Sequence, residues 1–520
     1  MYSKSSFIEL PESESKEFPK RIYDTRVKAK TISFDLLISN LINKFHITKF
    51  FLLFIKQCPS CKRKFSEIFI DYYITKKIKC KKCKFKTKFF TTLISIVLNV
   101  ISGSLNMPKE RFREILRKSE SLKRLALSYI EGIGLYGFKM PTVPIGPPVV
   151  FWSVTQRCNL NCTHCFVDQD LQEMSFDEAC TIIDQLSEAK NYILTFFGGE
   201  VLLRNDIFDL MRYASKKKIN VALASNGTLI DAEMAKKLKE VGVGYIQVSI
   251  DGLKDIHEQI RGIGTFEKAI SAIKYCLNEG IYTCIGTTIT KLNVHQIYDI
   301  VDMAKSLKIQ KLQLVDFVPS GKASLKSHFS LTPLQIEKFC LIVCDIWQKL
   351  IEEGYPLTLS YKNPIFARVL AQRFPKVKIA PFFKAVFSKE ALSYFNFSER
   401  LQNGVFSQQS PFDPFISGCE CGVFTMHIKS NGDVTPCPLN PAVLGNVKKH
   451  HVQKIWLGSP ILNQYRSLKY EGQCGKCNYK TICGGCRAKV FITSGSSIGS
   501  DPTCLLEIRN KDERKYRKIY

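Results

Sequence analysis

The chain has 520 residues, of which 45% are hydrophobic and 23% are charged, and its formal net charge is +28 at pH 7. These proportions exclude a disordered or collagen-like chain, and the length favours two or three folded domains. The first 26 residues are polar and lack an apolar run followed by a cleavage site, which excludes a secretory signal and predicts a cytoplasmic protein. The excess of Lys and Arg would attract polyanions, which include nucleic acid, an anionic membrane surface and acidic substrates.

The cysteines are numerous and clustered. The chain has 20 of them, and 15 stand in short clusters of the CxxC type. In an intracellular chain such clusters indicate metal rather than disulfides. The other five lie in apolar stretches and are predicted to be buried core residues: Cys180, Cys276, Cys284, Cys340 and Cys344.

The first predicted segment, residues 1–105, has a four-cysteine module at 58–83. Cys58 and Cys61 form one CxxC pair, and Cys80 and Cys83 form a second pair, with 18 residues between the two pairs. Four thiolates close a tetrahedral shell, so this spacing predicts a structural zinc ribbon, with a single iron as the alternative. The surrounding lysines would also suit nucleic acid, but the segment has no base-reading motif, so we do not expect nucleic acid as its partner.

Two apolar stretches, 36–55 and 89–105, flank this module. Polar residues interrupt both of them, so neither is predicted to span a membrane. An amphipathic helix that lies on a membrane or on a partner domain fits them better, and ordinary core packing is the alternative. A peripheral membrane contact therefore stays open beside the cytoplasmic prediction.

Residues 106–148 are predicted to form a helical linker that ends in a Pro/Gly-rich segment at 141–148. From 149 to 330, apolar runs alternate with amphipathic segments in a repeat of about thirty residues, the length of a right-handed βαβ crossover. The predicted strands are 149–154, 193–197, 220–224, 245–250, 282–288 and 311–318. The predicted helices are 175–190, 206–218, 231–241, 266–279 and 294–307.

Six such strands predict an α/β fold, a partial (β/α)6 TIM-type barrel whose site lies at the carboxyl ends of the strands. Residues 331–417 are Phe-rich and carry no readable motif, and we expect a helical insertion there.

A three-cysteine loop, Cys158-Asn-Leu-Asn-Cys162-Thr-His-Cys165, follows the first predicted strand. Three thiolates hold three irons of a [4Fe–4S] cluster, so the fourth iron keeps an open position for a substrate or cofactor. A structural metal loop that lacks one ligand is the alternative. The spacing favours a catalytic iron–sulfur site.

Short polar motifs follow the next three strands: Gly198-Gly199-Glu200, Ser225-Asn226-Gly227 and Ser249-Ile250-Asp251, with Arg261 further on. In this order behind the three-cysteine loop, they resemble the radical S-adenosylmethionine (SAM) superfamily. The resemblance implies that SAM binds the open iron and that one electron cleaves it to a 5′-deoxyadenosyl radical, which abstracts hydrogen from the substrate. It also implies that Gly198, Gly199, Glu200, Ser225, Asn226, Ser249, Asp251 and Arg261 contact SAM. Val201 and Phe166 stand where many members have Pro and Tyr, and neither replaces a ligand.

A second group of cysteines comprises Cys419, Cys421, Cys437, Cys474, Cys477, Cys483, Cys486 and Cys504. It resembles the SPASM extension of radical SAM enzymes, to which we assign residues 418–508, followed by a basic tail at 509–520. The resemblance implies one or two auxiliary [4Fe–4S] clusters. One would use Cys437 and Cys486 with Cys419 or Cys421, and the other would use Cys474, Cys477, Cys483 and Cys504. A pair of zinc knuckles is the alternative.

These patterns predict a radical SAM/SPASM oxidoreductase that abstracts hydrogen from a peptide, a tetrapyrrole or a lipid. An electron donor such as ferredoxin or flavodoxin is the expected partner. The alternative from another class is a zinc-ribbon nucleic-acid-binding protein whose iron–sulfur clusters sense redox state.

Overall fold

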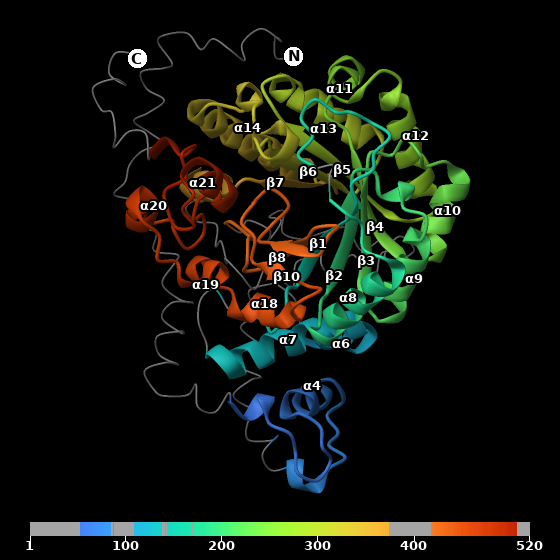
Figure 1. Cartoon of the computed structure of the whole chain (residues 1–520), viewed down its shortest axis with the longest axis vertical. Coiled ribbons are helices and arrows are strands. Elements are labelled where there is room, and N and C mark those ends of the chain that lie inside the picture. The colour runs from blue at the N-terminus through green and yellow to red at the C-terminus, as the bar shows by residue number, and fades with distance from the viewer. Residues whose placement is uncertain are drawn as a thin grey trace.

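The computed structural model describes residues 52–84, 87, 109–137, 141, 143–167, 171–373 and 418–506. Ten strands form one sheet in the order β10-β9-β8-β1-β2-β3-β4-β5-β6-β7 (Figure 1). Strands β1 to β7 pair in parallel, and β8 pairs in parallel with β1. The β8–β9 and β9–β10 pairs are antiparallel. The sheet is therefore an open parallel barrel with a short antiparallel extension at one edge.

The strands are β1 (Val149–Thr155), β2 (Ile193–Gly198), β3 (Asn220–Ser225), β4 (Val243–Ser249), β5 (Tyr282–Ile289), β6 (Lys311–Asp316), β7 (Thr358–Lys362), β8 (Thr425–Ile428), β9 (Asp433–Thr435) and β10 (Gly445–Asn446). The first six confirm the predicted strands and the predicted fold class.

The α-helices are α4 (Phe65–Thr75), α6 (Lys109–Lys118), α7 (Glu120–Tyr136), α8 (Phe176–Glu188), α9 (Ile207–Lys216), α10 (Ala232–Glu240), α11 (Lys254–Arg261), α12 (Thr265–Asn278), α13 (Ile297–Ser306), α14 (Pro333–Glu352), α15 (Pro364–Arg373), α18 (Val452–Gly458), α19 (Pro460–Ser467), α20 (Gly472–Lys476) and α21 (Arg487–Ser494). Short 3-10 helices are η2 (Leu52–Ile55), η3 (Val201–Leu203), η4 (Val294–Gln296), η5 (Gly321–Ala323) and η6 (Ser327–Phe329). The five helices predicted between the barrel strands are all present, as α8, α9, α10, α12 and α13.

The described part of the predicted helical insertion departs from the prediction. It contains α14 and α15, but β7 lies between them and extends the barrel by pairing with β6. The strand has only five residues, with polar Thr358 and Ser360 among them, so its apolar pattern was too short to read. The opposite edge of the barrel is extended as well, because β8 pairs in parallel with β1. The auxiliary region thus shares the sheet of the barrel.

The core lies on both faces of the sheet, as expected for parallel strands covered by helices. Trp152 of β1 stacks on Phe196 of β2, and neither side chain is exposed. Four of the five cysteines predicted as core are buried, and the fifth, Cys180, is partly buried against the same core. Their prediction as packing residues is confirmed.

The predicted linker helix is two helices, α6 and α7, with a break at Ser119. The Ser119 side chain accepts a hydrogen bond from the backbone N–H of Leu122, a standard cap for a helix start. Helix α7 lies at the amino ends of the barrel strands, because Ser121 hydrogen-bonds Asn220, the first residue of β3. It therefore covers the edge of the sheet opposite to the three-cysteine loop.

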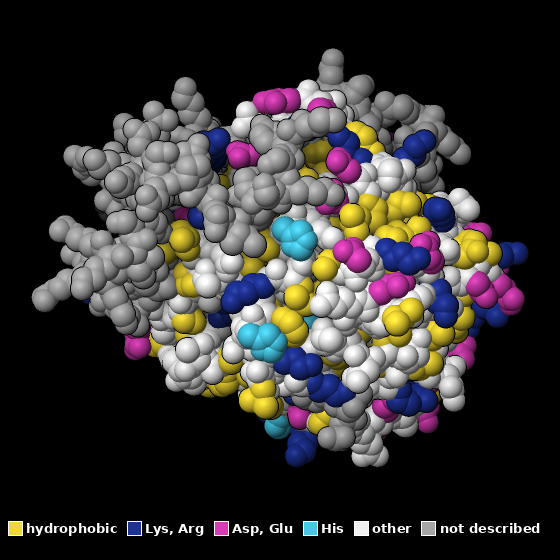
Figure 2. All heavy atoms as spheres, turned by 90° about the horizontal axis from the view of Figure 1, so that it is seen from above, with side chains coloured by type: hydrophobic (Ala, Val, Ile, Leu, Met, Phe, Trp, Pro, Cys, Tyr) yellow, Lys and Arg dark blue, Asp and Glu magenta, His cyan; other side chains and the backbone are white. Residues whose placement is uncertain are grey.

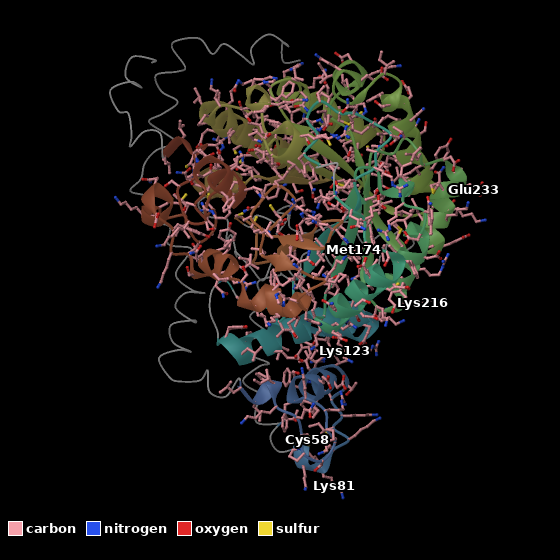
Figure 3. The ribbon with its side chains drawn as sticks, viewed as in Figure 1. Cys58, Lys81, Lys123, Met174, Lys216 and Glu233 are labelled. Carbon is pink, nitrogen blue, oxygen red and sulfur yellow. The ribbon has the colours of Figure 1, made fainter. Side chains whose placement is uncertain are left out.

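The four-cysteine module, residues 52–84, is joined to the barrel through Glu131 of α7. The buried carboxylate accepts hydrogen bonds from Lys64 at 2.9 Å and Ser66 at 3.0 Å of the module, and from Lys190 of the barrel at 2.9 and 3.0 Å. Burial opposes ionisation of Glu131, but the charges of Lys190 and Lys64 hold its pKa below the usual range. Figure 3 shows Cys58 and Lys81 of this module together at the end of the molecule beyond α7.

We expect Glu131→Gln to loosen the module from the barrel, because it leaves two lysines facing a neutral side chain. Breaking a buried ion pair by removing one partner costs about 3–5 kcal/mol. The check is limited proteolysis, in which the module should be released faster than from the unchanged protein. Glu120→Gln, on the exposed side of the same helix, should cleave like the unchanged protein, and equal rates for both variants would contradict the expectation.

No helix in the described part of the chain combines the length and the apolar composition needed to cross a bilayer. The apolar stretch 89–105, most of the stretch 36–55 and the tail 509–520 lie outside the described residues.

Candidate active site

The three-cysteine loop lies at the carboxyl edge of the barrel, directly after β1. Its backbone is fixed from two sides: Thr163 N–H donates to the carbonyl of Ile260 at 2.9 Å, and Lys326 Nζ donates to the carbonyl of Thr163 at 2.7 Å. All three cysteines are partly exposed. Burial raises the pKa of Cys162 to about 11 although Arg261 opposes this, so the free thiol is a weak nucleophile. The loop presents three accessible sulfurs from a fixed backbone, which suits metal ligation.

Gly198 and Gly199 allow the end of β2 to touch the start of the cysteine loop. The N–H of Gly199 donates to the carbonyl of Thr155 at 3.0 Å, and the N–H of Glu200 donates to the carbonyl of Arg157 at 2.7 Å. A Cβ atom on Gly199 would lie 2.2 Å from the Arg157 oxygen, inside its van der Waals surface. Glycine is therefore required here by the close approach of two backbones.

The carboxylate of Glu200 points into the interior of the protein. Its oxygens accept hydrogen bonds from the Ser225 hydroxyl at 2.9 Å and from the Asn226 N–H at 2.9 Å. The side chain is fully buried, and burial raises the pKa of its carboxyl group. Glu200 thus joins the ends of β2 and β3, while the backbone of the two glycines borders the cysteine loop.

Asn226 extends this connection to the cysteine loop itself. Its side-chain amide donates to Asn159 Oδ1 at 3.0 Å, and Asn159 donates to Thr228 Oγ1 at 2.8 Å. Asn159 and Thr228 were not predicted as site residues. The sequence contained a signal for Asn159, because it lies inside the three-cysteine motif and its amide can both donate and accept hydrogen bonds.

Asp251, just beyond the end of β4, is the most heavily paired acid of the site. Its carboxylate lies 2.6 Å from Arg261 Nε and 3.2 Å from His164 Nε2, and it accepts a hydrogen bond from the Thr288 N–H at 2.8 Å. Burial opposes ionisation, but Arg261 and His164 hold the pKa of the carboxyl group far below its usual range. Asp251 is therefore an anion that orients Arg261.

Arg261 places positive charge beside the cysteine loop, because its Nη1 lies 3.9 Å from Cys162 Sγ. Arg261 was predicted to contact SAM, and in the structure its guanidinium is paired with the carboxylate of Asp251. The neighbouring His257 accepts a hydrogen bond from the Asp251 N–H, and burial lowers its pKa to about 4, so it stays neutral. Ser249, the last residue of β4, lies at the same edge and is partly buried.

The cysteines of the auxiliary region form two groups. One group lines a single cavity together with Arg368: Cys474, Cys477, Cys483 and Cys504. In the other group, hydrogen bonds to Cys419 and Cys437, with burial, hold the pKa of Cys421 well above its usual range. Burial and the charge of Cys419 raise the pKa of Cys486 as well. The members of each cysteine group that the sequence predicted for an auxiliary cluster are therefore close to one another in space.

Arg487 lies between the two groups. Its buried guanidinium is 3.8 Å from Cys474 Sγ and packs over the ring of Tyr470, while its backbone amide hydrogen-bonds the thiol of Cys419. Arg487 was not predicted as a site residue, and its place directly after Cys486 was the one signal for it.

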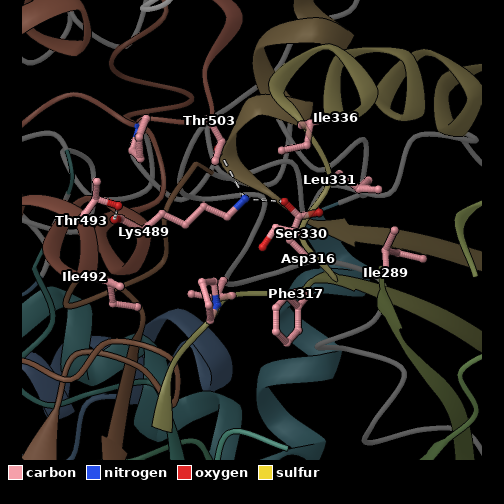
Figure 4. A pocket seen from close by; sticks show the side chains of 13 residues that line it. Ile289, Asp316, Phe317, Ser330, Leu331, Ile336, Lys489, Ile492, Thr493 and Thr503 are labelled. Atoms are coloured by element: carbon pink, nitrogen blue, oxygen red, sulfur yellow. Dashed lines mark hydrogen bonds and ion pairs between the residues drawn. The ribbon is translucent and has the colours of Figure 1, made fainter. Parts of the chain in front are cut away.

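A buried ion pair connects the barrel to the auxiliary region. Lys489 of α21 donates to Asp316 at the end of β6 at 2.7 Å, and both residues line one cavity (Figure 4). Asp316 also accepts hydrogen bonds from Asn363 and from the hydroxyl of Tyr361. Asp316 is thus held by side chains from other parts of the fold, namely Lys489 of α21, Tyr361 of β7 and Asn363 directly after β7.

We expect Asp316→Asn to lower the thermal unfolding midpoint by several degrees, because it leaves the Lys489 charge buried without a carboxylate. Adding Lys489→Met should restore part of the loss, since the second change removes the orphaned charge. Glu233→Gln, which breaks an exposed pair with Lys237 on α10, should change the midpoint little. Equal midpoints for the Asp316 and Glu233 variants would contradict the expectation.

The four-cysteine module has the dimensions of a single-metal site. Its sulfurs all lie within 4.8 Å of one another, with Cys58 and Cys80 at 3.9 Å and Cys61 and Cys83 at 3.8 Å. Zinc with bonds of about 2.3 Å to each thiolate places tetrahedral neighbours about 3.8 Å apart. The residues therefore fit one tetrahedral metal ion.

Charged side chains of both signs are mixed among the described residues on the surface that Figure 2 shows. On that face Lys and Arg are interspersed with Asp, Glu and apolar side chains. By contrast, six lysines around the second CxxC pair of the module are exposed: Lys76, Lys77, Lys79, Lys81, Lys82 and Lys84.

Comparison with known proteins defines the class. Residues 152–304 match the model of the radical SAM superfamily, and residues 419–478 match that of an iron–sulfur cluster-binding domain, SPASM. The chain is 30% identical over 394 residues to the AdoMet-dependent heme synthase of Oleidesulfovibrio alaskensis, a match that covers 73% of this chain and 94% of the relative. The chain belongs to the radical SAM superfamily.

Two further similarities bear on the particular enzyme. The chain is 26% identical over 373 residues to the mycofactocin maturase MftC of Mycobacterium ulcerans, covering 69% of this chain and 88% of the relative. The crystal structure of Streptococcus suis SuiB bound to S-adenosylmethionine superposes with a TM-score of 0.56 at 18% identity, over 85% of this chain and 93% of that one. The fold is thus that of a radical SAM enzyme with a SPASM iron–sulfur domain, and the protein is an enzyme of that kind.

Proposed function

We propose that Cys158, Cys162 and Cys165 hold the [4Fe–4S] cluster of this radical SAM enzyme and that SAM binds beside them. When bound, the cluster supplies the electron that cleaves SAM to the 5′-deoxyadenosyl radical, which removes hydrogen from the substrate. The observation that carries the proposal is the position of the loop: three accessible thiols stand at the carboxyl edge, next to the polar motifs that end β2, β3 and β4.

The surrounding residues would bind and orient SAM. Gly198 and Gly199 offer backbone groups close to the cysteine loop. Glu200 holds Ser225 and Asn226 in place, so that they line the site beside Ser249. Asp251 fixes Arg261 next to Cys162, where its charge would stabilise thiolate ligands.

The auxiliary cysteines would hold two further [4Fe–4S] clusters, in the partition that their grouping supports. Cys474, Cys477, Cys483 and Cys504 would bind one of them. Cys437, Cys486 and either Cys419 or Cys421 would bind the other. The basic side chain of Arg487 would stabilise negative charge on both.

We further propose that the substrate is a tetrapyrrole. Of the two relatives described above, the heme synthase has the higher identity and is covered over the larger share of its length. A peptide and a lipid are the other substrate classes that the test must distinguish. A ferredoxin or flavodoxin is the expected electron donor, and a cytoplasmic location is expected. Because the superfamily consists of enzymes, the nucleic-acid-binding alternative is not retained.

The test is anaerobic reconstitution with iron, sulfide, SAM and dithionite. Release of 5′-deoxyadenosine is expected without added substrate at a low rate, and Fe-coproporphyrin III, the named product of a related synthase, should increase that rate and be converted. Conversion of a peptide or lipid with no effect of the porphyrin would reject the tetrapyrrole while keeping the radical chemistry. No 5′-deoxyadenosine under any condition would reject the radical chemistry itself.

The module at 58–83 would hold one structural zinc ion. It docks at the amino edge of the barrel, so a strand length of roughly 20 Å separates it from the cysteine loop. Elemental analysis should find about one zinc per chain, which Cys61→Ser removes while 5′-deoxyadenosine formation persists. Iron instead of zinc would favour the single-iron alternative.

A further inference from the structure

The outer end of the four-cysteine module is strongly basic. Four lysines directly flank Cys80 and Cys83, whose sulfurs lie within 4.8 Å of the other two cysteine sulfurs of the module. Because neighbouring Cα atoms in a chain are about 3.8 Å apart, the metal site gathers these charges into a small area. With two more lysines after α4 they form a set of exposed side chains that we call the basic tip: Lys76, Lys77, Lys79, Lys81, Lys82 and Lys84.

The module does not supply enough negative charge to neutralise the basic tip. Residues 52–84 contain two acidic side chains, Glu67 and Asp71. Glu67 pairs with Arg63, and Asp71 pairs with Arg63 and also with Lys123 of α7. A zinc ion on four thiolates would carry a net charge of about −2, which is smaller than the charge of the lysines. The basic tip therefore keeps a positive surplus that attracts an anionic partner.

The basic tip lies at one end of the described molecule. Figure 3 places Lys81 and Cys58 there, beyond α7, with the barrel on the other side of that helix. A flat surface could therefore touch the basic tip without meeting the described barrel. The three-cysteine loop is at the opposite, carboxyl edge of the barrel, so it would face away from such a surface.

The composition around the basic tip favours a lipid bilayer over nucleic acid. Nucleic-acid sites commonly use arginine to grip bases and aromatic rings to stack on them, and residues 76–84 contain neither. The apolar stretches 36–55 and 89–105 flank the module in the sequence, and Leu52, in the described part of the first stretch, is 43% exposed. Lysines next to apolar residues are typical of segments that bind anionic membrane surfaces.

We propose that the basic tip binds the anionic headgroups of a lipid bilayer and holds the enzyme at the cytoplasmic face of a membrane. Each lysine close to such a surface strengthens binding about fivefold, and the attraction extends about 8 Å at physiological salt. Several lysines in one small area therefore act together. The active-site edge would stay open to the solution. The proposal is independent of the proposed reaction, because the contact is remote from the three-cysteine loop.

The experiment is flotation of the full-length, metal-loaded protein with two kinds of vesicle. One kind contains only phosphatidylcholine, and the other contains phosphatidylcholine mixed with anionic phosphatidylglycerol. The protein should float with the anionic vesicles and not with the neutral ones. Raising the salt from about 50 mM to about 500 mM should release it, because the screening length becomes shorter.

A variant that removes four charges of the basic tip should lower the partition coefficient on anionic vesicles more than about 100-fold. It combines Lys77→Gln, Lys79→Gln, Lys81→Gln and Lys82→Gln. The matched control removes four charges from exposed lysines on the barrel helices and should partition like the unchanged protein. It combines Lys216→Gln, Lys236→Gln, Lys268→Gln and Lys274→Gln. Because both variants change the net charge equally, a difference between them reports the position of the charges.

The metal content of the module and the release of 5′-deoxyadenosine should be unchanged in both variants. If the basic-tip variant loses its metal, the double variant Lys76→Gln with Lys77→Gln decides instead, since both residues lie outside the second CxxC pair. It should weaken partition about 10-fold to 30-fold.

Three outcomes would overturn the proposal, and none of them affects the proposed radical chemistry. The first is equal flotation of the basic-tip variant and the control variant with anionic vesicles. The second is salt-sensitive binding of DNA or RNA that the basic-tip variant loses, without flotation, which would make nucleic acid the partner. The third is binding to neither vesicles nor nucleic acid, which would make the basic tip a solvated surface only.

Discussion

Cys162→Ser is expected to abolish 5′-deoxyadenosine formation, to below one thousandth of the rate of the unchanged enzyme. The physical reason is the loss of one of three ligands, after which a cluster with an open iron is no longer held. The sulfur of Cys162 also lies 3.9 Å from Nη1 of Arg261, so the substitution removes the sulfur next to that charge. The measurement is chromatography of anaerobic reactions with SAM and dithionite.

Iron analysis provides the second readout of the same variant. The variant should bind roughly four fewer iron atoms per chain than the unchanged enzyme and keep the absorbance of its auxiliary clusters. Cys180→Ser is the matched control, because this cysteine packs against the core and lies outside all the clusters. Full activity of Cys162→Ser, or equal loss in both variants, would show that the three-cysteine loop is not the SAM site.

Asp251→Asn is expected to have the second-largest effect, on stability and SAM binding together. It leaves the Arg261 guanidinium, whose side chain is 11% exposed, without its carboxylate. Removing one partner of a buried pair costs about 3–5 kcal/mol. The thermal unfolding midpoint should fall, and Arg261 should no longer be held at Cys162. The SAM-dependent change in the electron paramagnetic resonance spectrum of the reduced cluster should therefore weaken.

Asp255→Asn is the control for this change. Asp255 lies on the same helix, α11, and is exposed. It should match the unchanged enzyme in both measurements. If the Asp251 variant keeps the unfolding midpoint and the SAM-dependent spectral change of the unchanged enzyme, then Arg261 is positioned by other contacts.

The sequence was sufficient to predict the barrel strands and the edge at which the polar motifs meet. Each motif directly follows an apolar run, and parallel strands bring their carboxyl ends to one edge. The direction of individual side chains was not predictable. Glu200 was expected to face a bound molecule, but its carboxylate is used by Ser225 and Asn226. Burial and pairing partners depend on the three-dimensional arrangement, which residue type and spacing do not specify.

Contacts between distant segments were also missed. Strand β8 pairs with β1, and His427 hydrogen-bonds Ser153 although 274 positions separate them. The cysteines of residues 418–508 suggested a separate metal-dependent domain, because their spacing is local and β8, the longest strand between them, has only four residues. No local pattern reveals which edge such a strand will join.

The pairing of β8 with β1 has a consequence for any shortened version of this enzyme. A chain that stopped before residue 418 would lack the strand whose backbone now satisfies the outer edge of β1. That edge would then offer unpaired N–H and carbonyl groups along Val149 to Trp152, the residues that β8 covers. Exposed edges of this kind recruit other strands, so the isolated barrel would tend to self-associate. The iron–sulfur extension thus covers the outer edge of the catalytic sheet, and we expect the barrel to require it.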